Sequence, residues 1–165
     1  MTIVKASLPL TPCTVTMSID QEAEMSTEEI DTFLGNQETG VLSLARADTP
    51  YAIPISYGYD GTSRRFYMRL VSTPESEKRE FLASAPEARL VVYDNEGATY
   101  RSVVAIGTLE AIPPSDLTAE RIEQYGRAKR PLFEIWAESK PDLDIELYEL
   151  APDHLSGRRT EIDLE

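Results

Sequence analysis

The chain has 165 residues, of which 41% are hydrophobic, and this suits one globular domain with a full core. Asp and Glu number 29 against 16 Lys and Arg, a formal net charge of −13. This balance argues against nucleic acid as a partner, because neutralising phosphates needs a basic face. The longest apolar runs have the length of strands, and the N-terminus lacks the apolar core of a secretion signal. We therefore expect a cytoplasmic protein that does not enter a membrane.

Rare residue types narrow the possible chemistry. Cys13 and His154 are the single cysteine and histidine, so an intrachain disulfide is impossible and no metal site of the Cys/His type is expected. The same scarcity disfavours Ser-His-Asp and Cys-His catalysis. Most cations are arginines, and an acidic surface poor in lysine is typical of proteins from salt-loving organisms. We expect a halophilic protein, with an acidic protein of ordinary salt tolerance as the alternative.

The chain begins with residues 1–24, which carry little periodicity and are assigned to an N-terminal arm ahead of one domain, residues 25–165. Ser26 with Glu29 three positions later is a capping box that predicts the start of a helix. The apolar face of this helix has the spacing i, i+3 and i+4, and consists of Ile30, Phe33 and Leu34.

Strand patterns dominate the rest of the chain. Tyr51 to Tyr59 alternates bulky with small residues, and Pro54 places this strand at an edge, a bulge or a break because proline cannot donate to a ladder. Gly107 indicates a bulge in a long strand. The expected strands are 40–45, 51–59, 65–71, 88–94, 98–112, 145–150 and 155–160. The expected helices after the first begin at Thr73-Pro74 and cover 116–127 and 131–137. Six or seven mostly antiparallel strands with inserted helices favour an α+β, mainly β fold, a partly closed barrel, over a parallel sheet.

Polar residues gather where the third expected strand passes into a helix. Arg69, Ser72, Thr73, Ser76 and Lys78 lie within ten residues. A strand end, hydroxyls, a helix N-terminus and two cations together can hold a phosphate. The alternatives are that Arg69 pairs with a carboxylate, that Lys78 is solvated, and that the hydroxyls only cap the helix.

The order of five segments resembles the pyridoxamine 5′-phosphate oxidase-like, FMN-binding split-barrel proteins, and most of all their nitroimidazole-reductase-like branch. The segments are TGVLSLA, PYAIPISYGYDG, FYMRLVSTPESEKREFL, ARLVVYD and YRSVVAIGTLE. The resemblance covers about residues 25–112, with a weaker likeness in LYELAPDHLSGR near the end.

The resemblance implies an FMN-binding split β-barrel that forms a homodimer with FMN at the interface. Arg69 and Lys78 would hold the phosphate with Ser72, Thr73 and Ser76. The flavin ring would lie against Pro54, Ile55, Ser56 and the backbone of Met68, Arg69 and Leu70. Arg101 or Ser102 would reach the cofactor from a second side, and Trp136 would stack on the ring from the partner subunit.

The expected function is that of a flavoprotein oxidoreductase, with NAD(P)H-linked reduction of a small acceptor such as a nitroaromatic, a quinone or a flavin. No side chain is assigned as a catalytic acid or base. The alternatives are a non-catalytic flavin or haem binding module, a deazaflavin-dependent reductase, and a structural dimer whose phosphate site has decayed. Haem is less favoured because His154 is the only histidine available as an axial ligand.

Overall fold

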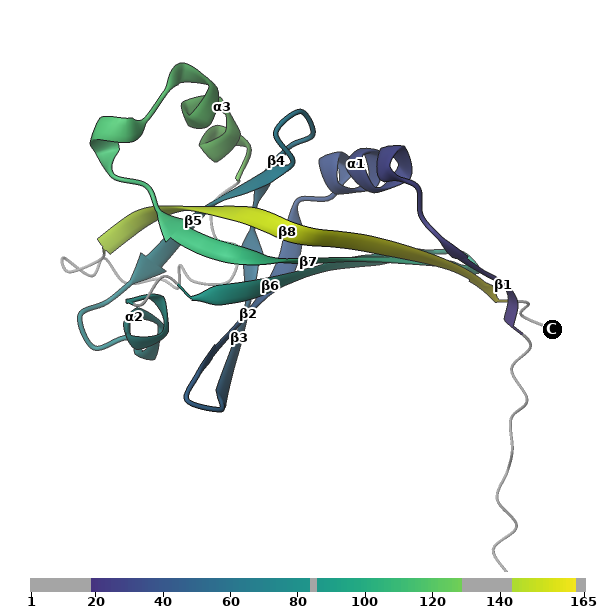
Figure 1. Ribbon diagram of the computed structural model, residues 1–165, viewed down its shortest axis with the longest axis horizontal. Coiled ribbons are helices and arrows are strands. Elements are labelled where there is room, and N and C mark those ends of the chain that lie inside the picture. The colour runs from purple at the N-terminus through teal and green to yellow at the C-terminus, as the bar shows by residue number, and fades with distance from the viewer. Residues whose placement is uncertain (1–18, 84–85, 129–143, 163–165) are drawn as a thin grey trace, which may run out of the picture.

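The computed structural model describes residues 19–83, 86–128 and 144–162. Its main feature is an eight-stranded antiparallel sheet with the strand order β3-β2-β6-β7-β8-β5-β4, and β1 pairs with β8 off this path (Figure 1). The strands are β1 (Ile19–Glu24), β2 (Thr39–Arg46), β3 (Thr49–Ser56), β4 (Gly58–Asp60), β5 (Arg65–Ser72), β6 (Glu87–Glu96), β7 (Thr99–Ala111) and β8 (Asp144–Ile162). The helices are α1 (Thr27–Asn36), α2 (Glu77–Leu82) and α3 (Ala119–Arg127), with a 3₁₀ turn at Pro114–Asp116.

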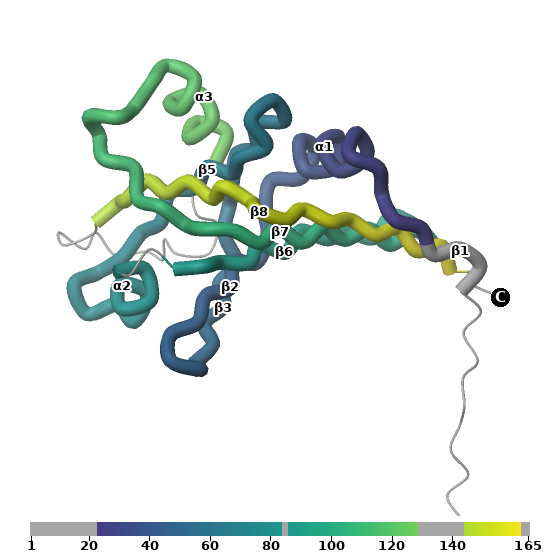
Figure 2. Tube along the Cα trace, viewed as in Figure 1, coloured from purple at the N-terminus to yellow at the C-terminus, as the bar shows by residue number. Residues whose placement is uncertain are grey.

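The sheet curls into a split barrel. Its two end strands, β3 and β4, are separated in the chain by Tyr57 alone, so the ends of the hydrogen-bonded path meet at one residue. Figure 2 shows the segment from β3 to β4 running from the β2–β3 hairpin at the lower edge to the β4 hairpin at the upper edge. No ladder joins β3 to β4, and the barrel stays open there. The expected mainly β, partly closed barrel is confirmed.

Helix α1 forms as its sequence predicts. The Ser26 hydroxyl accepts from the Glu29 N–H at 3.2 Å, and the Glu29 carboxylate accepts from the Ser26 N–H at 2.7 Å. The apolar face of Ile30, Phe33 and Leu34 is buried. Gly157 of β8 lies beneath this helix, and a side chain there would come within 2.8 Å of Ile30. The glycine therefore permits close packing of α1 on the sheet.

The expected strand 51–59 is wrong in its length. It divides at Tyr57, whose N–H donates to Glu38 at 3.1 Å and whose hydroxyl donates to Leu34 at 3.0 Å. Both bonds lead toward the end of α1 and away from the ladder, so the chain turns from β3 into β4. Pro54 lies on the edge strand β3, as predicted.

The two expected closing strands are one strand of 19 residues, β8. Opposite Ile106 and Gly107 its register steps from His154 to Pro152, so Asp153 is an extra residue. The Pro-Asp-His segment is a bulge and not a loop. The irregularity at Gly107 was predicted; its effect on β8 was not, because it depends on a partner strand far along the chain.

Two helix starts differ from prediction. Thr73-Pro74 begins a turn closed by the Ser76 N–H to the Thr73 carbonyl at 3.0 Å, and α2 starts only at Glu77. Thr118 caps α3, since its hydroxyl accepts from the Arg121 N–H at 3.3 Å. The expected helix 131–137 lies outside the described residues. Within those residues, no helix is long and apolar enough to cross a membrane.

Candidate functional site

The Arg69 side chain lies beneath the last turn of α3. Arg69 is on β5, on the face opposite the core residues Met68 and Leu70. Its Nη2 donates to the carbonyl oxygen of Ala128, the C-cap residue of α3. Its Nε is buried and has no hydrogen-bond partner among the described residues. A buried guanidinium N–H without an acceptor is costly, so an anion, a polar ligand group or an ordered water is the expected partner.

Lys78 points inward from α2. It is only 5% exposed, and its Nζ donates to the carbonyl oxygen of Val71 at 2.7 Å. The helix is held by its apolar residues, because Phe81 and Leu82 are buried and Phe81 stacks on Tyr51 with centroids 4.8 Å apart. This packing brings the ammonium group to the carbonyl of Val71, two residues after Arg69 on β5.

Ser72 and Arg79 add a hydroxyl and a third cation to the junction. Ser72 is buried, and its hydroxyl accepts from Arg79 Nε at 3.2 Å. Arg79 also pairs with Asp144 at the start of β8. The sequence reasoning missed Arg79, although the residue follows Lys78 directly. Thr73 and Ser76 are half-buried, and Ser76 makes no side-chain capping bond.

The residues expected along the flavin ring divide into two groups. Ile55, Met68 and Leu70 have their side chains in the hydrophobic core, so only their backbone is available to a ligand. Pro54 is exposed on the edge strand. Ser56 is buried at 5% exposure, and its hydroxyl has no hydrogen-bond partner in the part of the chain that the structure describes.

Arg101 and Ser102 do not lie at this junction. In the sheet Arg101 is opposite Arg159 of β8, whereas Arg69 is opposite Leu147 of the same strand. Twelve residues of extended strand span about 40 Å. One small ligand therefore cannot touch Arg69 and Arg101 of the same chain. Trp136 lies outside the described residues.

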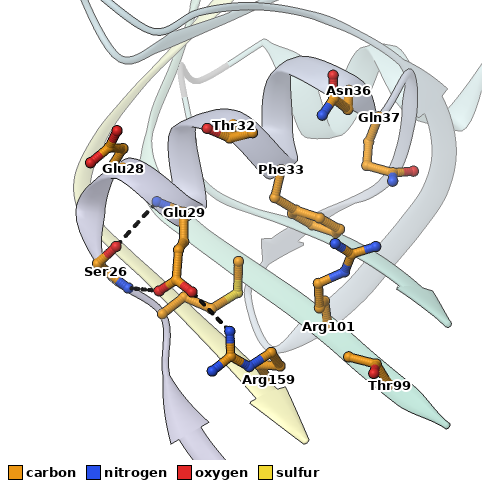
Figure 3. Close-up of a pocket in the computed structure, with 11 residues that line it drawn as sticks. Ser26, Glu28, Glu29, Thr32, Phe33, Asn36, Gln37, Thr99, Arg101 and Arg159 are labelled. Atoms are coloured by element: carbon orange, nitrogen blue, oxygen red, sulfur yellow. Dashed lines mark hydrogen bonds and ion pairs between the residues drawn. The ribbon is translucent and has the colours of Figure 1, made fainter. Parts of the chain in front are cut away.

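Arg101 instead lines a pocket of about 420 Å³ between α1 and the strands β7 and β8 (Figure 3). Its guanidinium lies 5.4 Å from the centre of the Phe33 ring. Both arginines at this pocket are engaged within the chain: Arg101 with Asp94, and Arg159 with Glu29 at 2.9 Å. This pairing leaves no marker for a ligand comparable to the unpartnered Nε of Arg69.

The outer face of the sheet is free of acidic side chains over two complete rows of directly opposed residues and a third row that is interrupted between Thr39 and Tyr93. Residues opposite each other in an antiparallel ladder share a face. The rows join β3, β2, β6, β7 and β8 in part, and none of their members is buried except Ser56. They comprise Ala52, Ser43, Arg89, Ile106 and His154; Pro54, Val41, Val91, Val104 and Ser156; and Ser56, Thr39, Tyr93, Ser102 and Arg158. We call these residues the outer face.

The fold and the cationic junction define a split-barrel protein with a candidate phosphate site. A family profile described as pyridoxamine 5′-phosphate oxidase matches residues 26–159, and the chain belongs to this family. No curated protein matches the chain significantly.

Solved structures share the fold. An FAD-binding protein from Mesorhizobium loti has 25% identity and a TM-score of 0.63, covering 84% of this chain and 97% of its own. An FAD and heme binding protein from Mycobacterium smegmatis has 20% identity and a TM-score of 0.60, covering 88% and 75%. A proposed 5-nitroimidazole antibiotic resistance protein from Bacteroides thetaiotaomicron has 14% identity and a TM-score of 0.62, covering 93% and 98%.

Proposed function

We propose that this protein binds FMN at the interface of a homodimer and uses it as an oxidoreductase. The observation that carries the proposal is the buried Nε of Arg69, which has no acceptor among the described residues and lies at the cationic junction of a family member. The solved relatives from Mesorhizobium loti and Mycobacterium smegmatis are flavin-binding proteins by name, which supports a flavin here.

The residue types near the end of β5 have the chemistry that binds a phosphate monoester. Arg69 and Arg79 supply guanidinium donors and Ser72 supplies a hydroxyl, and charge-assisted bonds of this kind are the stronger ones in proteins. Glu75 and Glu77 are exposed, so their carboxylates do not fill the space under α3. The unpartnered hydroxyl of Ser56 suits a polar edge of the flavin ring.

A second copy of the chain explains why the expected cofactor residues lie so far apart. One flavin held by Arg69 would meet Arg101 only if that residue came from the partner, since about 40 Å of strand separates the two within a chain. The outer face supports such a dimer, because copies of a chain with net charge −13 repel each other least where acidic side chains are absent. The outer face also carries β-branched residues and Tyr93, which is 68% exposed, and these provide apolar area that a dimer could bury.

FMN held near Arg69 would supply hydride and electron transfer, from a donor such as NAD(P)H to a small acceptor, which we propose to be a nitroaromatic, a quinone or another flavin. Arg69, Lys78 and Ser72 would hold the phosphate, and the backbone of β5 would orient the ring. No described side chain is required as an acid or base in this assignment.

The first test is the visible spectrum of the purified protein, followed by mass analysis of the released ligand. A flavin spectrum with FMN released supports the proposal, whereas release of FAD or a deazaflavin would correct the cofactor. A colourless protein that takes up no added flavin would overturn it. Steady-state oxidation of NADH or NADPH with added acceptors then separates an oxidoreductase from a binding module without turnover.

The second test addresses the site. Arg69→Ala removes a charge-assisted hydrogen bond worth about 2–3 kcal/mol, so the Kd for FMN should rise about 30- to 150-fold. Arg64→Ala is the matched control, because Arg64 pairs with Asp31 of α1 at 3.2 Å and lies away from the junction. Equal retention of FMN by both variants would contradict the assignment of Arg69.

A further inference from the structure

The underside of α3 carries a second cluster of charges besides the Arg69 contact. Glu149 of β8 has a side chain only 5% exposed, and it is paired on both sides. Arg65 of β5 binds its Oε1, and Arg121 of α3 lies 3.3 Å from its Oε2. A buried carboxylate held by two cations on different elements fixes those elements relative to each other. Removal of either cation would weaken the compensation of a buried charge and so destabilise the fold.

Three further contacts fix the position of α3. The hydroxyl of Tyr125 donates to the carbonyl oxygen of Tyr148 at 3.1 Å, and its ring meets Tyr67 edge-on at 5.4 Å. Gly58 of β4 lies so close to the backbone of Gln124 that a Cβ atom would collide with it. These contacts place the last turn of α3 directly over Arg69, and α3 lies beside β4 and β5 in Figure 1.

We propose that α3 is a positioning element for the cofactor's anionic end, acting through Arg69, and that cofactor occupancy and docking of α3 are therefore coupled. The inference rests on the proposed function and deepens it. The carbonyl of Ala128 holds one N–H group of the Arg69 guanidinium, and the unpartnered Nε remains for the ligand. The negative end of the α3 dipole also stabilises a cation placed at the C-terminus of the helix.

The energetic reason is preorganisation. An arginine side chain loses substantial rotamer freedom when it is fixed, and a docked α3 removes that freedom before the ligand arrives. If α3 is docked in only a fraction of molecules, the apparent Kd rises by the inverse of that fraction. By linkage, a ligand that binds better when α3 is docked must stabilise the docked helix by the same factor.

Arg121→Gln tests the positioning role, because Arg121 touches Glu149 and Asp116 but has no contact with the junction. We expect the Kd for FMN to rise about 5- to 20-fold, in the usual range of coupling between sites. Arg121→Lys keeps the charge and should restore binding to within about threefold of the parent. Arg127→Gln is the control on the same helix, since Arg127 pairs only with Glu123 among the ion pairs of the described residues.

A double variant separates positioning from general destabilisation. If Arg121 acts through Arg69, adding Arg121→Gln to Arg69→Ala should weaken FMN binding no further. An additive loss would overturn the inference. If Arg121→Gln does not fold, Tyr125→Phe loosens the same helix more gently and enters the same comparison with Arg69→Ala.

Hydrogen exchange measured without ligand tests the contact between α3 and Arg69 independently of the proposed function. In the apo protein, Arg69→Ala should speed exchange of the amides in the last turn of α3, residues 124–128, relative to the parent and to Arg64→Ala. Saturating FMN should slow exchange there in the parent only. A parent that binds no FMN refutes the proposed function, and the apo comparison then decides the α3–Arg69 link alone. Unchanged exchange in Arg69→Ala would refute that link.

Discussion

Arg101 of β7 holds Asp94 of β6 through two N–H···O bonds of 3.1 and 2.9 Å, and its guanidinium also lies over the ring of Phe33. Hydrogen bonding to Asp94 raises the pKa of Arg101, so this arginine stays charged throughout the useful pH range. The pair fixes the side chain near the far end of the long strands, about 40 Å along β8 from the row of Arg69. Within one chain, Arg101 therefore lies far from the junction of Arg69.

Mixing two defective variants tests whether the site is shared between subunits. Arg69→Ala and Arg101→Gln each damage both sites of a homodimer. In a mixed dimer, one site combines the intact Arg69 of one chain with the intact Arg101 of the other. Random refolding should therefore restore FMN at about one quarter of all sites, measured by bound flavin absorbance. Bound flavin no greater than the average of the two separate variants would contradict a shared site. Either both arginines would then serve the same subunit's site, or Arg101 would not contact the flavin.

The capping box of α1 should contribute measurably to stability. Ser26→Ala removes the hydroxyl that accepts from Glu29 N–H, and the loss of such a cap costs about 1 kcal/mol in urea unfolding. Ser115→Ala is a matched control, because its hydroxyl makes only a 3.5 Å contact on the surface and its loss should stay within about 0.5 kcal/mol. Equal effects of the two substitutions would contradict the cap.

The same box predicts an acid dependence. Hydrogen bonds from the Ser26 backbone and side chain lower the pKa of Glu29 below its model-compound value of 4.5. The contribution of the Glu29 charge is therefore present above pH 4.5 and lost as pH falls through the lower folded pKa. Glu29→Gln keeps the hydrogen-bonding shape of the box, so its difference from the parent in urea midpoint should vanish at acid pH. A difference that persists there would contradict the charge effect.

Buried tyrosines should make the protein labile in alkali. Burial raises the pKa of Tyr57, and burial with smaller contributions raises those of Tyr59, Tyr125 and Tyr148. The unfolded chain releases these protons near pH 10 whereas the folded chain retains them, so stability falls as pH rises above about 10. Tyr57→Phe should flatten this fall, measured as urea midpoints from pH 8 to 11. It should also cost about 1–2 kcal/mol at pH 8, because the Leu34 carbonyl loses its buried donor.

Two glycines should respond to alanine in opposite ways. At Gly58 a Cβ atom would collide with the backbone of Gln124, so Gly58→Ala should destabilise by about 1–3 kcal/mol. At Gly126 in α3 a Cβ atom meets nothing within 4 Å, so Gly126→Ala should stabilise by about 0.5–1 kcal/mol through helix propensity. Thermal unfolding of both variants checks the signs, and a stabilising Gly58→Ala would refute the close approach of α3.

Several features followed from the sequence alone because their causes are local. The start of α1 is set by Ser26 and Glu29, which are three residues apart and bond to each other's backbone. Pro54 restricted its strand to an edge, a bulge or a break, and Gly107 indicated a bulge. Lys78 reaches the end of β5 because a short turn and a packed helix follow that strand, and its Nζ donates to the Val71 carbonyl.

The tertiary structure decided everything that depends on partners distant in the chain. The single strand β8 exists because β7 continues to pair across the bulge at Asp153, which no local pattern at Pro152 reveals. The bond from Arg69 to Ala128 joins residues 59 positions apart, and the pairing of Glu149 with Arg65 spans 84. Sequence spacing cannot encode such contacts, since they arise only when register and helix packing bring the groups together. The separation of Arg101 from Arg69 follows likewise from the registers of β7 and β5 on β8.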